Sequence, residues 1–298
     1  MTVCDVVGIG ENSVDLVYRV PQLPAAGQKV RVSNCRRLVG GQVATTLCTC
    51  AGLGLRTRYL GAFGNDEHGR LIRSELEQRG VETSHSAVRY APNRHAVILV
   101  DERTGERTIA WHRDAALALQ PRDLAPEALA GARLLHVDNV DEEMAIAAAR
   151  LARAAGMMVT TDVDVVTDNT GVLIAAATLP IFAAHVPEVL TGQTDPRRAL
   201  RELRRQYGAM LCVTLGSRGA MLLAGDELFE APAFRVEAID TTGAGDVFRG
   251  ALIFSLLRGD PPESMLRFAN AAAAVSCTRE GAIASVPNLQ EIDRLVVS

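Results

Sequence analysis

The sequence predicts an α/β fold in which helices flank a mostly parallel central sheet, with a small β-sheet lid beside it. Short apolar runs alternate with segments of helical periodicity along most of the chain, and this alternation is typical of parallel sheets joined by helical crossovers. Two stretches, about 14–39 and 88–113, break the rhythm with extended, partly polar runs, so we assign them to a discontinuous lid. With 298 residues, 48% of them hydrophobic, the chain is predicted to be one large domain over residues 1–298.

Each element follows from its local pattern. Short apolar runs bounded by glycine or aspartate indicate buried strands, whereas apolar residues spaced three and four apart before a glycine indicate helices. Within the lid, two β-rich runs at 94–111 predict a hairpin with a turn around Thr104 and Gly105. The other predicted elements are strands at 4–9, 57–64, 134–139, 157–165, 210–216 and 219–231, and helices at 41–52, 68–80, 141–156, 246–259 and 262–281.

Composition argues against several classes of protein. A net charge of -4 is unlike the basic stripe of a nucleic-acid-binding protein, and the arginines of 197–205 read as one solvated helix face. Six scattered cysteines lack zinc-site spacing, which favours a reduced, cytoplasmic protein. The N-terminus lacks a signal-peptide pattern, and no apolar run is long enough to span a membrane.

The stretch DTTGAGDVFRG, residues 240–250, carries the strongest functional signal. Its glycines stand just before an apolar helical run, where the first backbone N–H groups are unpaired and lie at the positive end of the helix dipole. Such a turn can hold a phosphate. Asp246, directly beside it, could accept a proton from a hydroxyl that attacks a phosphoryl group. A plain helix N-cap is the alternative.

This stretch resembles the C-terminal motif of the ribokinase-like sugar kinases, the PfkB family. Three further segments are similar to family motifs, in the family's order, and together they cover almost the whole chain. They are VGGQVATTLCTCAGLG with YLGAFGNDEHG, VTLGSRGAMLL, and RFANAAAAVSCTREGAIASVP. The resemblance implies a ribokinase-like three-layer sandwich with a small β-sheet lid.

The resemblance also implies a role for each matching residue. Asp246 would be the catalytic base, and the amides of Gly243, Ala244 and Gly245 would form the anion hole. The residues implied to hold the sugar are Asn12, Asp15, Gly40, Gly41, Gln42 and Asp138. Those implied to border ATP are Thr214, Gly216, Gly219 and Asn270. Those implied to surround a monovalent cation, usually K⁺, mostly through backbone carbonyls, are Asp240, Thr242, Ser276, Arg279, Gly281 and Ser285.

Read without the resemblance, several of these residues have simpler roles. Asp15 fits a solvated strand residue, Gly40 and Gly41 fit a turn before a helix, and Asn270 fits a residue that bonds only to backbone. These alternatives stay open at the level of sequence.

The chain departs from the family pattern at one motif. Many members carry N-x-x-E before L-T-G, and these residues help to position Mg²⁺; Ala183 and Val186 stand at those places here. Mg²⁺ would then be held by the nucleotide phosphates and water, since it keeps much of its hydration. Ketohexokinases and sulfofructose kinases also lack the pair, and GERTIAWH in the lid looks like theirs, which favours a ketose. Whether the acceptor already carries a phosphate is open, with Arg94, Arg107 and Arg113 as residues that could bind one.

The sequence therefore predicts an ATP-dependent carbohydrate kinase that uses Mg²⁺ and K⁺ and dimerises through its lid. A nucleoside kinase of the same family, or a non-catalytic sugar-binding regulator on this fold, are the alternatives; the intact Asp246 opposes the regulator. A P-loop enzyme is excluded because G-x-x-x-x-G-K-[ST] is absent. A dinucleotide dehydrogenase is disfavoured because Ser13 replaces the third glycine of its fingerprint.

Overall fold

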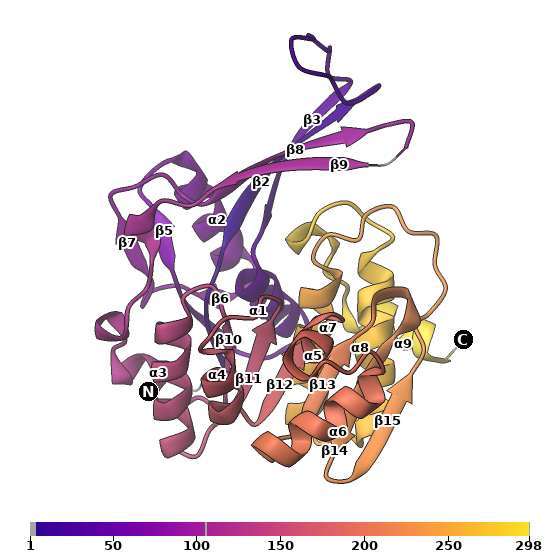
Figure 1. The fold of residues 1–298 in the computed structure, drawn as a ribbon. Coiled ribbons are helices and arrows are strands. Elements are labelled where there is room, and N and C mark those ends of the chain that lie inside the picture. Colours follow the sequence, from indigo (N-terminus) through magenta and orange to yellow (C-terminus); the bar gives the residue numbers. More distant parts are fainter. Residues whose placement is uncertain (1–3, 105, 298) are drawn as a thin grey trace.

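The computed structural model describes residues 4–104 and 106–297. Within these residues, nine strands form a central sheet in the order β15-β14-β13-β12-β11-β10-β1-β4-β6 (Figure 1). The strands pair in parallel except at β13–β14 and β14–β15, which are antiparallel. They are β1 (Val6–Ile9), β4 (Thr57–Leu60), β6 (Val81–Glu82), β10 (Leu134–Asp138), β11 (Met158–Val163), β12 (Leu179–Phe182), β13 (Leu211–Thr214), β14 (Ala220–Ala224) and β15 (Glu227–Ala231).

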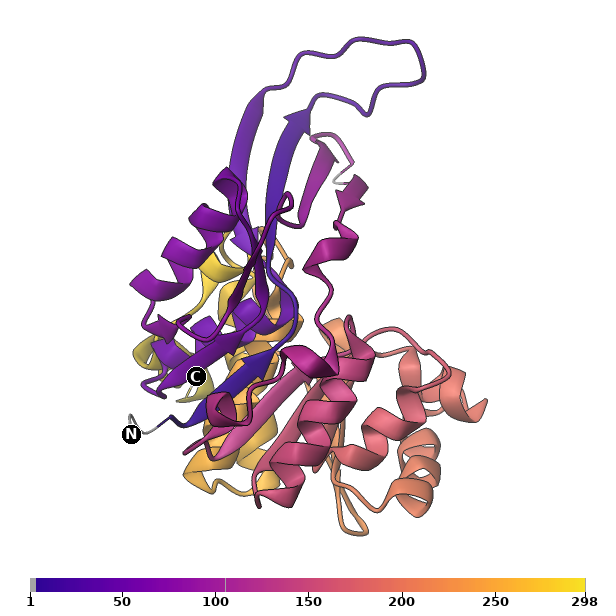
Figure 2. The ribbon, with the colours of Figure 1, turned by 90° about the vertical axis from the view of Figure 1, so that its left-hand side faces the viewer.

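Helices cover both faces of this sheet (Figure 2). Side chains alternate along each strand: Val7 and Leu135 pack into one apolar cluster, whereas Val6 and Leu134 pack into another on the opposite face. The first face carries α3 (Glu142–Ala154), α4 (Thr170–Ala176), α5 (Val186–Thr191) and α6 (Pro196–Tyr207). The second carries α1 (Gln42–Gly52), α2 (Glu67–Gln78), α7 (Ala244–Arg258), α8 (Pro262–Ser276) and α9 (Leu289–Val297). These three layers confirm the predicted fold class.

A second sheet projects from the carboxyl edge of the first (Figure 1). Its strands pair in the order β3-β2-β8-β9, and we call it the lid. They are β2 (Ser13–Val20), β3 (Asn34–Gly40), β8 (His95–Asp101) and β9 (Arg107–His112). Because β2 follows β1 directly and β3 leads directly into α1, the lid is joined to the ends of elements that border the same edge of the central sheet.

The structure differs from the expected elements in a few places. The segment predicted as one strand at 57–64 is divided into β4 and β5 (Ala62–Gly64), and β5 pairs with β7 (Ala87–Arg89) outside the lid sheet. Strand β12 and helix α5 were not predicted. Gly105, part of the predicted lid turn, lies outside the described residues. Short 3-10 turns occur at Ala115–Leu117, Pro121–Asp123, Pro126–Leu129, Gly216–Arg218 and Ile283–Ser285.

All six cysteines are free thiols. Among the helices of the described residues, none has the length and apolarity needed to cross a membrane.

Helices α1 and α7 touch backbone to backbone. A Cβ atom added to Gly250 would lie 2.5 Å from the Thr49 Cβ and 2.7 Å from the Thr46 carbonyl oxygen. The Thr46 hydroxyl donates a hydrogen bond to the carbonyl oxygen of Asp246 at 3.1 Å. Only glycine at position 250 allows this approach, and it places the start of α7 beside α1.

We predict that Gly250→Ala destabilises the protein by about 1–3 kcal/mol, because the added methyl group overpacks the α1–α7 contact. Equilibrium unfolding in urea measures the change. Gly52→Ala is the matched control, since a Cβ there meets only Val286 Cγ1 at an ordinary 3.5 Å. Equal stability of Gly250→Ala and wild type would contradict the close contact.

Candidate active site

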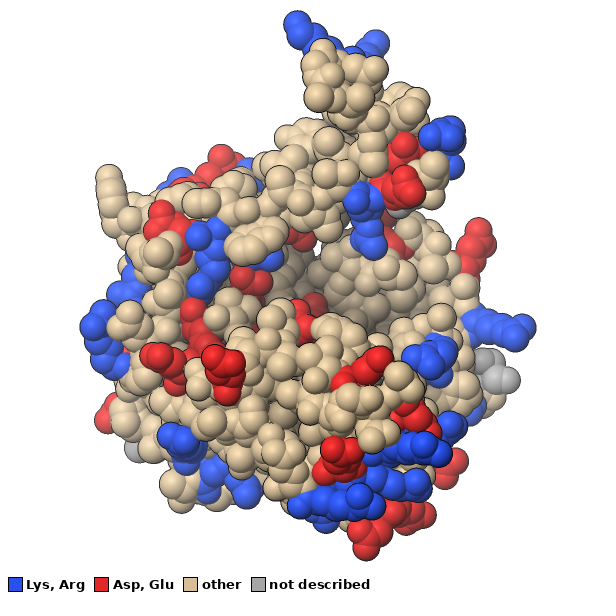
Figure 3. Space-filling model, viewed as in Figure 1, with Lys and Arg blue, Asp and Glu red and all other residues tan. Residues whose placement is uncertain are grey.

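A hollow lies between the lid and the body of the protein, and acidic side chains are visible inside it (Figure 3). It includes a cavity of about 240 Å³. Lid residues including Asp15 and Leu38 line one side of this cavity, and residues 238–242 and 280–282 line the other. The hollow therefore brings the DTTGAGD stretch, the lid and the loop after α8 to one place.

Helix α7 begins in this region. Gly243 is its N-cap, with a φ of 75°, and a Cβ there would lie 2.6 Å from the Ala282 Cβ. Ala244 and Gly245 open the helix, so the three predicted anion-hole residues share one helix N-terminus. Backbone N–H groups in a first turn have no partner within the helix and lie at its positive end, which suits an anion. The Ala244 N–H donates a hydrogen bond to the Thr241 carbonyl oxygen at 3.2 Å, just before the helix, so its role in an anion hole stays a prediction.

Asp246 occupies the first turn of α7, and 15% of its side-chain surface is exposed. Burial raises the pKa of its carboxyl group well above the ordinary value, and the charges of Asp162, Asp164 and Asp138 raise it further. Arg249, with Nη1 3.6 Å from Asp246 Oδ1, opposes this effect. A carboxylate with a raised pKa accepts protons more readily near neutral pH.

Facing this helix are the polar groups predicted to hold a sugar. The carboxylate of Asp15, on β2, lines the cavity, and burial raises its pKa. Gly41 is the N-cap of α1 with a φ of 106°, and a Cβ there would lie 2.4 Å from the Asn12 Cα, so glycine is required. Gln42 donates a hydrogen bond from Nε2 to Asp164 Oδ2 at 2.7 Å. Its buried Oε1 has no hydrogen-bond partner among the described residues, which leaves an acceptor for a ligand hydroxyl.

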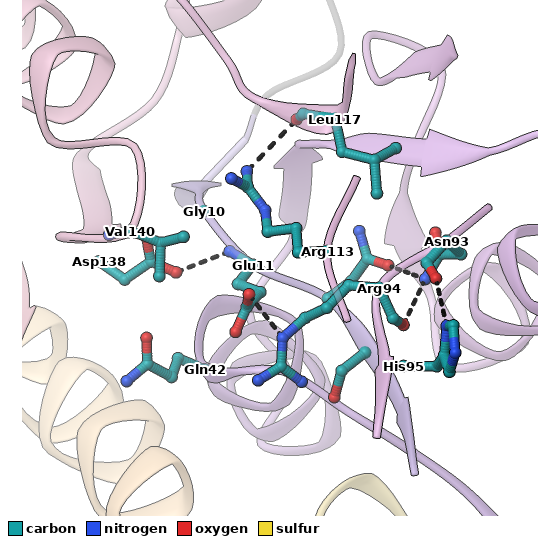
Figure 4. A network of polar contacts seen from close by, with 12 residues as sticks. Gly10, Glu11, Gln42, Asn93, Arg94, His95, Arg113, Leu117, Asp138 and Val140 are labelled. Carbon is teal, nitrogen blue, oxygen red and sulfur yellow. Dashed lines mark hydrogen bonds and ion pairs between the residues drawn. The ribbon is translucent and has the colours of Figure 1, made fainter. Parts of the chain in front are cut away.

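Glu11 and Arg94 belong to the same region, although the sequence reasoning did not single out Glu11 (Figure 4). Glu11 Oε1 and Arg94 Nε form an ion pair at 2.7 Å, and burial raises the pKa of Glu11. Arg94 and Arg107 both line a cavity beneath the lid, whereas Arg113 pairs with Asp141 at 2.6 Å. The signal for Glu11 was available in the sequence, since an acidic residue directly follows the glycine that ends the first strand.

Asn12 and Asp138 use their polar atoms inside the protein. Asn12 Nδ2 donates to the Tyr59 hydroxyl at 2.8 Å, and its Oδ1 accepts a hydrogen bond from Asn93 at 3.0 Å. Asp138 Oδ2 accepts a hydrogen bond from the Glu11 backbone N–H at 2.6 Å. Both residues thus hold the turn between β1 and β2 in place, which shapes the wall of the site; direct contact with a sugar stays a prediction.

The residues predicted to surround a monovalent cation lie in two loops that touch. Asp240 accepts hydrogen bonds from the Thr242 N–H at 2.9 Å and from the Gly281 N–H at 2.9 Å. Burial alone would raise the pKa of Asp240, but these hydrogen bonds lower it below the ordinary value. Ser276 and Ser285 donate their hydroxyls to nearby backbone carbonyls, and Arg279 pairs with Glu291.

The binding of a cation by these loops, mainly through backbone oxygens, stays a prediction. Across the described part of the chain, no group of three or more His, Cys, Asp or Glu side chains is placed to hold a metal ion.

The predicted nucleotide residues lie on β13, around the turn that follows it, and on α8. Thr214 ends β13, Gly216 begins the 3-10 turn Gly216–Arg218, and Gly219 directly follows that turn; their φ angles are 59° for Gly216 and 93° for Gly219. Asn270 Nδ2 donates to the Ala231 carbonyl at 2.9 Å, so this donor already serves the backbone, and contact with adenine stays a prediction. Where the family motif N-x-x-E would stand, Val186 is fully buried in the core.

Comparison with known proteins gives a consistent result. The model of the "pfkB family carbohydrate kinase" matches residues 4–289. The ATP-dependent ribose-1-phosphate kinase of Halopiger xanaduensis is 29% identical over 293 residues, which are 93% of this chain and 93% of that protein.

Solved structures show the same likeness over nearly the full length. Ribokinase from Thermotoga maritima superposes with a TM-score of 0.86 at 25% identity, covering 99% of this chain and 100% of that one. Arabidopsis thaliana ribokinase complexed with ribose and ATP gives a TM-score of 0.85 at 25% identity, covering 99% of each chain. The family model, the sequence match and the shared fold agree with the motifs around Asp246, and the chain belongs to the pfkB family of carbohydrate kinases.

Proposed function

We propose that this protein transfers the γ-phosphate of ATP to a hydroxyl group of a sugar, with Asp246 as the base. The observation that carries this proposal is the position of Asp246 in the first turn of α7, next to the predicted anion-hole residues. Asp15 lines one cavity with Thr241 and Thr242, which precede this helix, and Gln42 binds Asp164, whose charge acts on Asp246. The acceptor hydroxyl gives its proton to Asp246 as its oxygen attacks the γ-phosphorus. The bond between that phosphorus and the β,γ-bridging oxygen breaks, and ADP leaves.

The amides of Gly243, Ala244 and Gly245 stabilise the charge that grows on the transferring phosphoryl group. Losing one such donor typically costs on the order of 3 kcal/mol of transition-state stabilisation. Gly40 and Gly41 bring the backbone close to the acceptor, and Asp15 and Gln42 Oε1 accept hydrogen bonds from its hydroxyls. Closure of the lid excludes water, which would otherwise compete as an acceptor.

The nucleotide lies along Thr214, Gly216 and Gly219, with Asn270 beside it. Mg²⁺, held by the nucleotide phosphates and water, neutralises phosphate charge when bound. K⁺ fits between the loops of Asp240, Thr242, Ser276, Arg279, Gly281 and Ser285. The hydrogen bond from the Gly281 N–H to Asp240 already joins these loops, so the chain's own residues set their spacing behind the anion hole.

The first test is an ADP-release assay with Mg²⁺-ATP and K⁺ against fructose, ribose, 2-keto-3-deoxygluconate, sulfofructose, sugar phosphates and nucleosides. Asp246→Asn is expected to lower kcat by at least about 100-fold, because the base is lost. Asp293→Asn, at an exposed position of α9, is the control and should keep wild-type activity. An Asp246→Asn enzyme with near wild-type kcat would remove Asp246 from the mechanism.

Asp15→Asn is expected to reduce kcat/KM for the acceptor by roughly 10- to 100-fold, because hydrogen bonds to a charged group are stronger than those to a neutral amide. The KM for ATP should change little, since Asp15 lies on the lid side of the site. Steady-state kinetics with each substrate varied in turn separates the two effects. An equal loss of kcat/KM for the acceptor and for ATP would place Asp15 outside the sugar site.

A homodimer through the lid is the expected assembly. All residues of the edge strand β9 are exposed, among them Ile109 at 54% and Trp111 at 65%, and an open β edge with apolar side chains favours pairing. Light scattering should give the mass of two chains, and Trp111→Glu should shift it toward one. Val189→Glu, exposed at 61% on α5, is the control. A wild-type monomer at all concentrations would contradict the dimer.

A further inference from the structure

A buried ion pair lies directly beneath Asp246. Arg249 stands three residues further along α7, and helical side chains point back toward the N-terminus of their helix. Its side chain is 6% exposed, and Nη2 contacts Asp162 Oδ1, whose side chain is 1% exposed. Nη1 of the same guanidinium lies 3.6 Å from Asp246 Oδ1. Arg249 therefore lies between the two carboxylates.

Hydrogen bonding around this ion pair is incomplete. In the described part of the structure, both carboxylate oxygens of Asp162 and the Nε of Arg249 lack a well-aligned hydrogen-bond partner. Buried ion pairs usually lose as much to desolvation as they gain from attraction, so stability alone does not account for the pair. Its position under the start of α7 provides a second reason for it.

The fit around Arg249 is close. A Cβ atom on Gly245 would lie 2.7 Å from Arg249 Nη1, so the guanidinium rests against the backbone of the anion hole. A side chain at position 245 would therefore require the Arg249 guanidinium to move.

Most of the charged groups that face Asp246 are negative. Asp162 and Asp164 approach from β11 and the residues after it, Asp138 approaches from β10, and Arg249 approaches from α7 itself. Arg249 is the one positive charge among these described groups. The buried His136 on β10 adds no charge, because burial first, and Arg249 second, lower its pKa to about 3.

We propose that Arg249, fixed by Asp162, is a positioning residue that keeps the Asp246 carboxylate charged and aimed at the acceptor hydroxyl. This inference rests on the proposed function of Asp246 as the base. Asp162 holds one end of the guanidinium. Its positive charge therefore acts on Asp246 from 3.6 Å, without a direct hydrogen bond that would occupy the Asp246 carboxylate. One oxygen of Asp246 thus stays available for the acceptor proton.

The two members of the pair should then act in opposite directions on the pH dependence of kcat/KM. Arg249→Met removes the positive charge, which raises the pKa of Asp246 and moves the acidic limb to higher pH. At pH 6.5 the variant is expected to be at least about tenfold slower than wild type, with the difference closing toward pH 9. Asp162→Asn removes a negative charge and frees Arg249 to bind Asp246, which moves the acidic limb to lower pH.

Two further variants separate this role from packing. Arg249→Lys keeps a positive charge, so the acidic limb of its kcat/KM profile should lie closer to that of wild type than the limb of Arg249→Met does. The double variant Arg249→Met/Asp162→Asn removes both charges of the buried pair, so it should fold even where Arg249→Met does not, with the acidic limb of its pH profile between those of the single variants. Uniformly lower rates with unmoved limbs, or shifts of both single variants in one direction, would overturn the proposal.

A direct titration tests the inference without any acceptor. The ¹³C signal of the Asp246 carboxyl group, assigned as the aspartate signal missing from Asp246→Asn, should titrate at higher pH in Arg249→Met and at lower pH in Asp162→Asn than in wild type. These shifts, with no turnover on any acceptor, would uphold the role of Arg249 and reject the kinase proposal. Unshifted signals in an enzyme that does phosphorylate a sugar would reject the role of Arg249 alone.

Discussion

The close contact of α1 with α7 is the constraint on which the rest of the site depends. Gly250 lets the two backbones meet, and the Thr46 hydroxyl ties α1 to the carbonyl of Asp246 itself. Helix α1 starts at Gln42, directly after the glycines that end the lid strand β3, and α7 starts at Ala244. One contact between helices thereby sets the distance between the acceptor side and the phosphate side of the site.

The proposed reaction brings together an acceptor and a phosphate, and the two require different hydrogen-bonding groups from the protein. Hydroxyl groups of an acceptor require hydrogen-bond acceptors, and in the proposed function Asp15 and the Gln42 carbonyl supply them. Phosphate requires hydrogen-bond donors and is repelled by carboxylates, and the same proposal assigns these donors to the backbone amides at the start of α7. Arg94 and Arg249 offset the carboxylates from opposite sides, one at the lid and one beneath Asp246.

The lid is connected to the loop that follows α8. Glu280 pairs with Arg19 of β2 at 3.0 Å and with Arg36 of β3 at 3.0 Å. The next residue, Gly281, donates its N–H to Asp240. The lid, the proposed cation loops and the DTTGAGD stretch are therefore linked through neighbouring residues, so that movement of the lid bears on the loops behind the anion hole.

The sequence by itself determined the fold class and the family, and it supplied the candidate positions of the site. Alternating strand and helix patterns suffice for a three-layer sandwich, and a run such as DTTGAGD carries its chemistry locally, because a helix N-terminus needs only glycines and an apolar helix after it. Strand β12 and helix α5 were missed because their segments are short, and the lid boundary near Val88 was missed because pairing with β5 is a long-range choice.

Only the tertiary structure decided which hydrogen-bonding atoms of each polar side chain remain available to a ligand. In sequence, Asn12 and Gln42 look alike as sugar-binding amides. In the structure, the amide of Asn12 makes hydrogen bonds with Tyr59 and Asn93, whereas Gln42 has a buried oxygen without a hydrogen-bond partner among the described residues. In sequence, Arg249 looks like an ordinary helix residue, whereas in the structure it forms an ion pair with Asp162 of β11. Hydrogen-bond capacity and charge depend on neighbours distant in sequence, and local patterns contain no information about those neighbours.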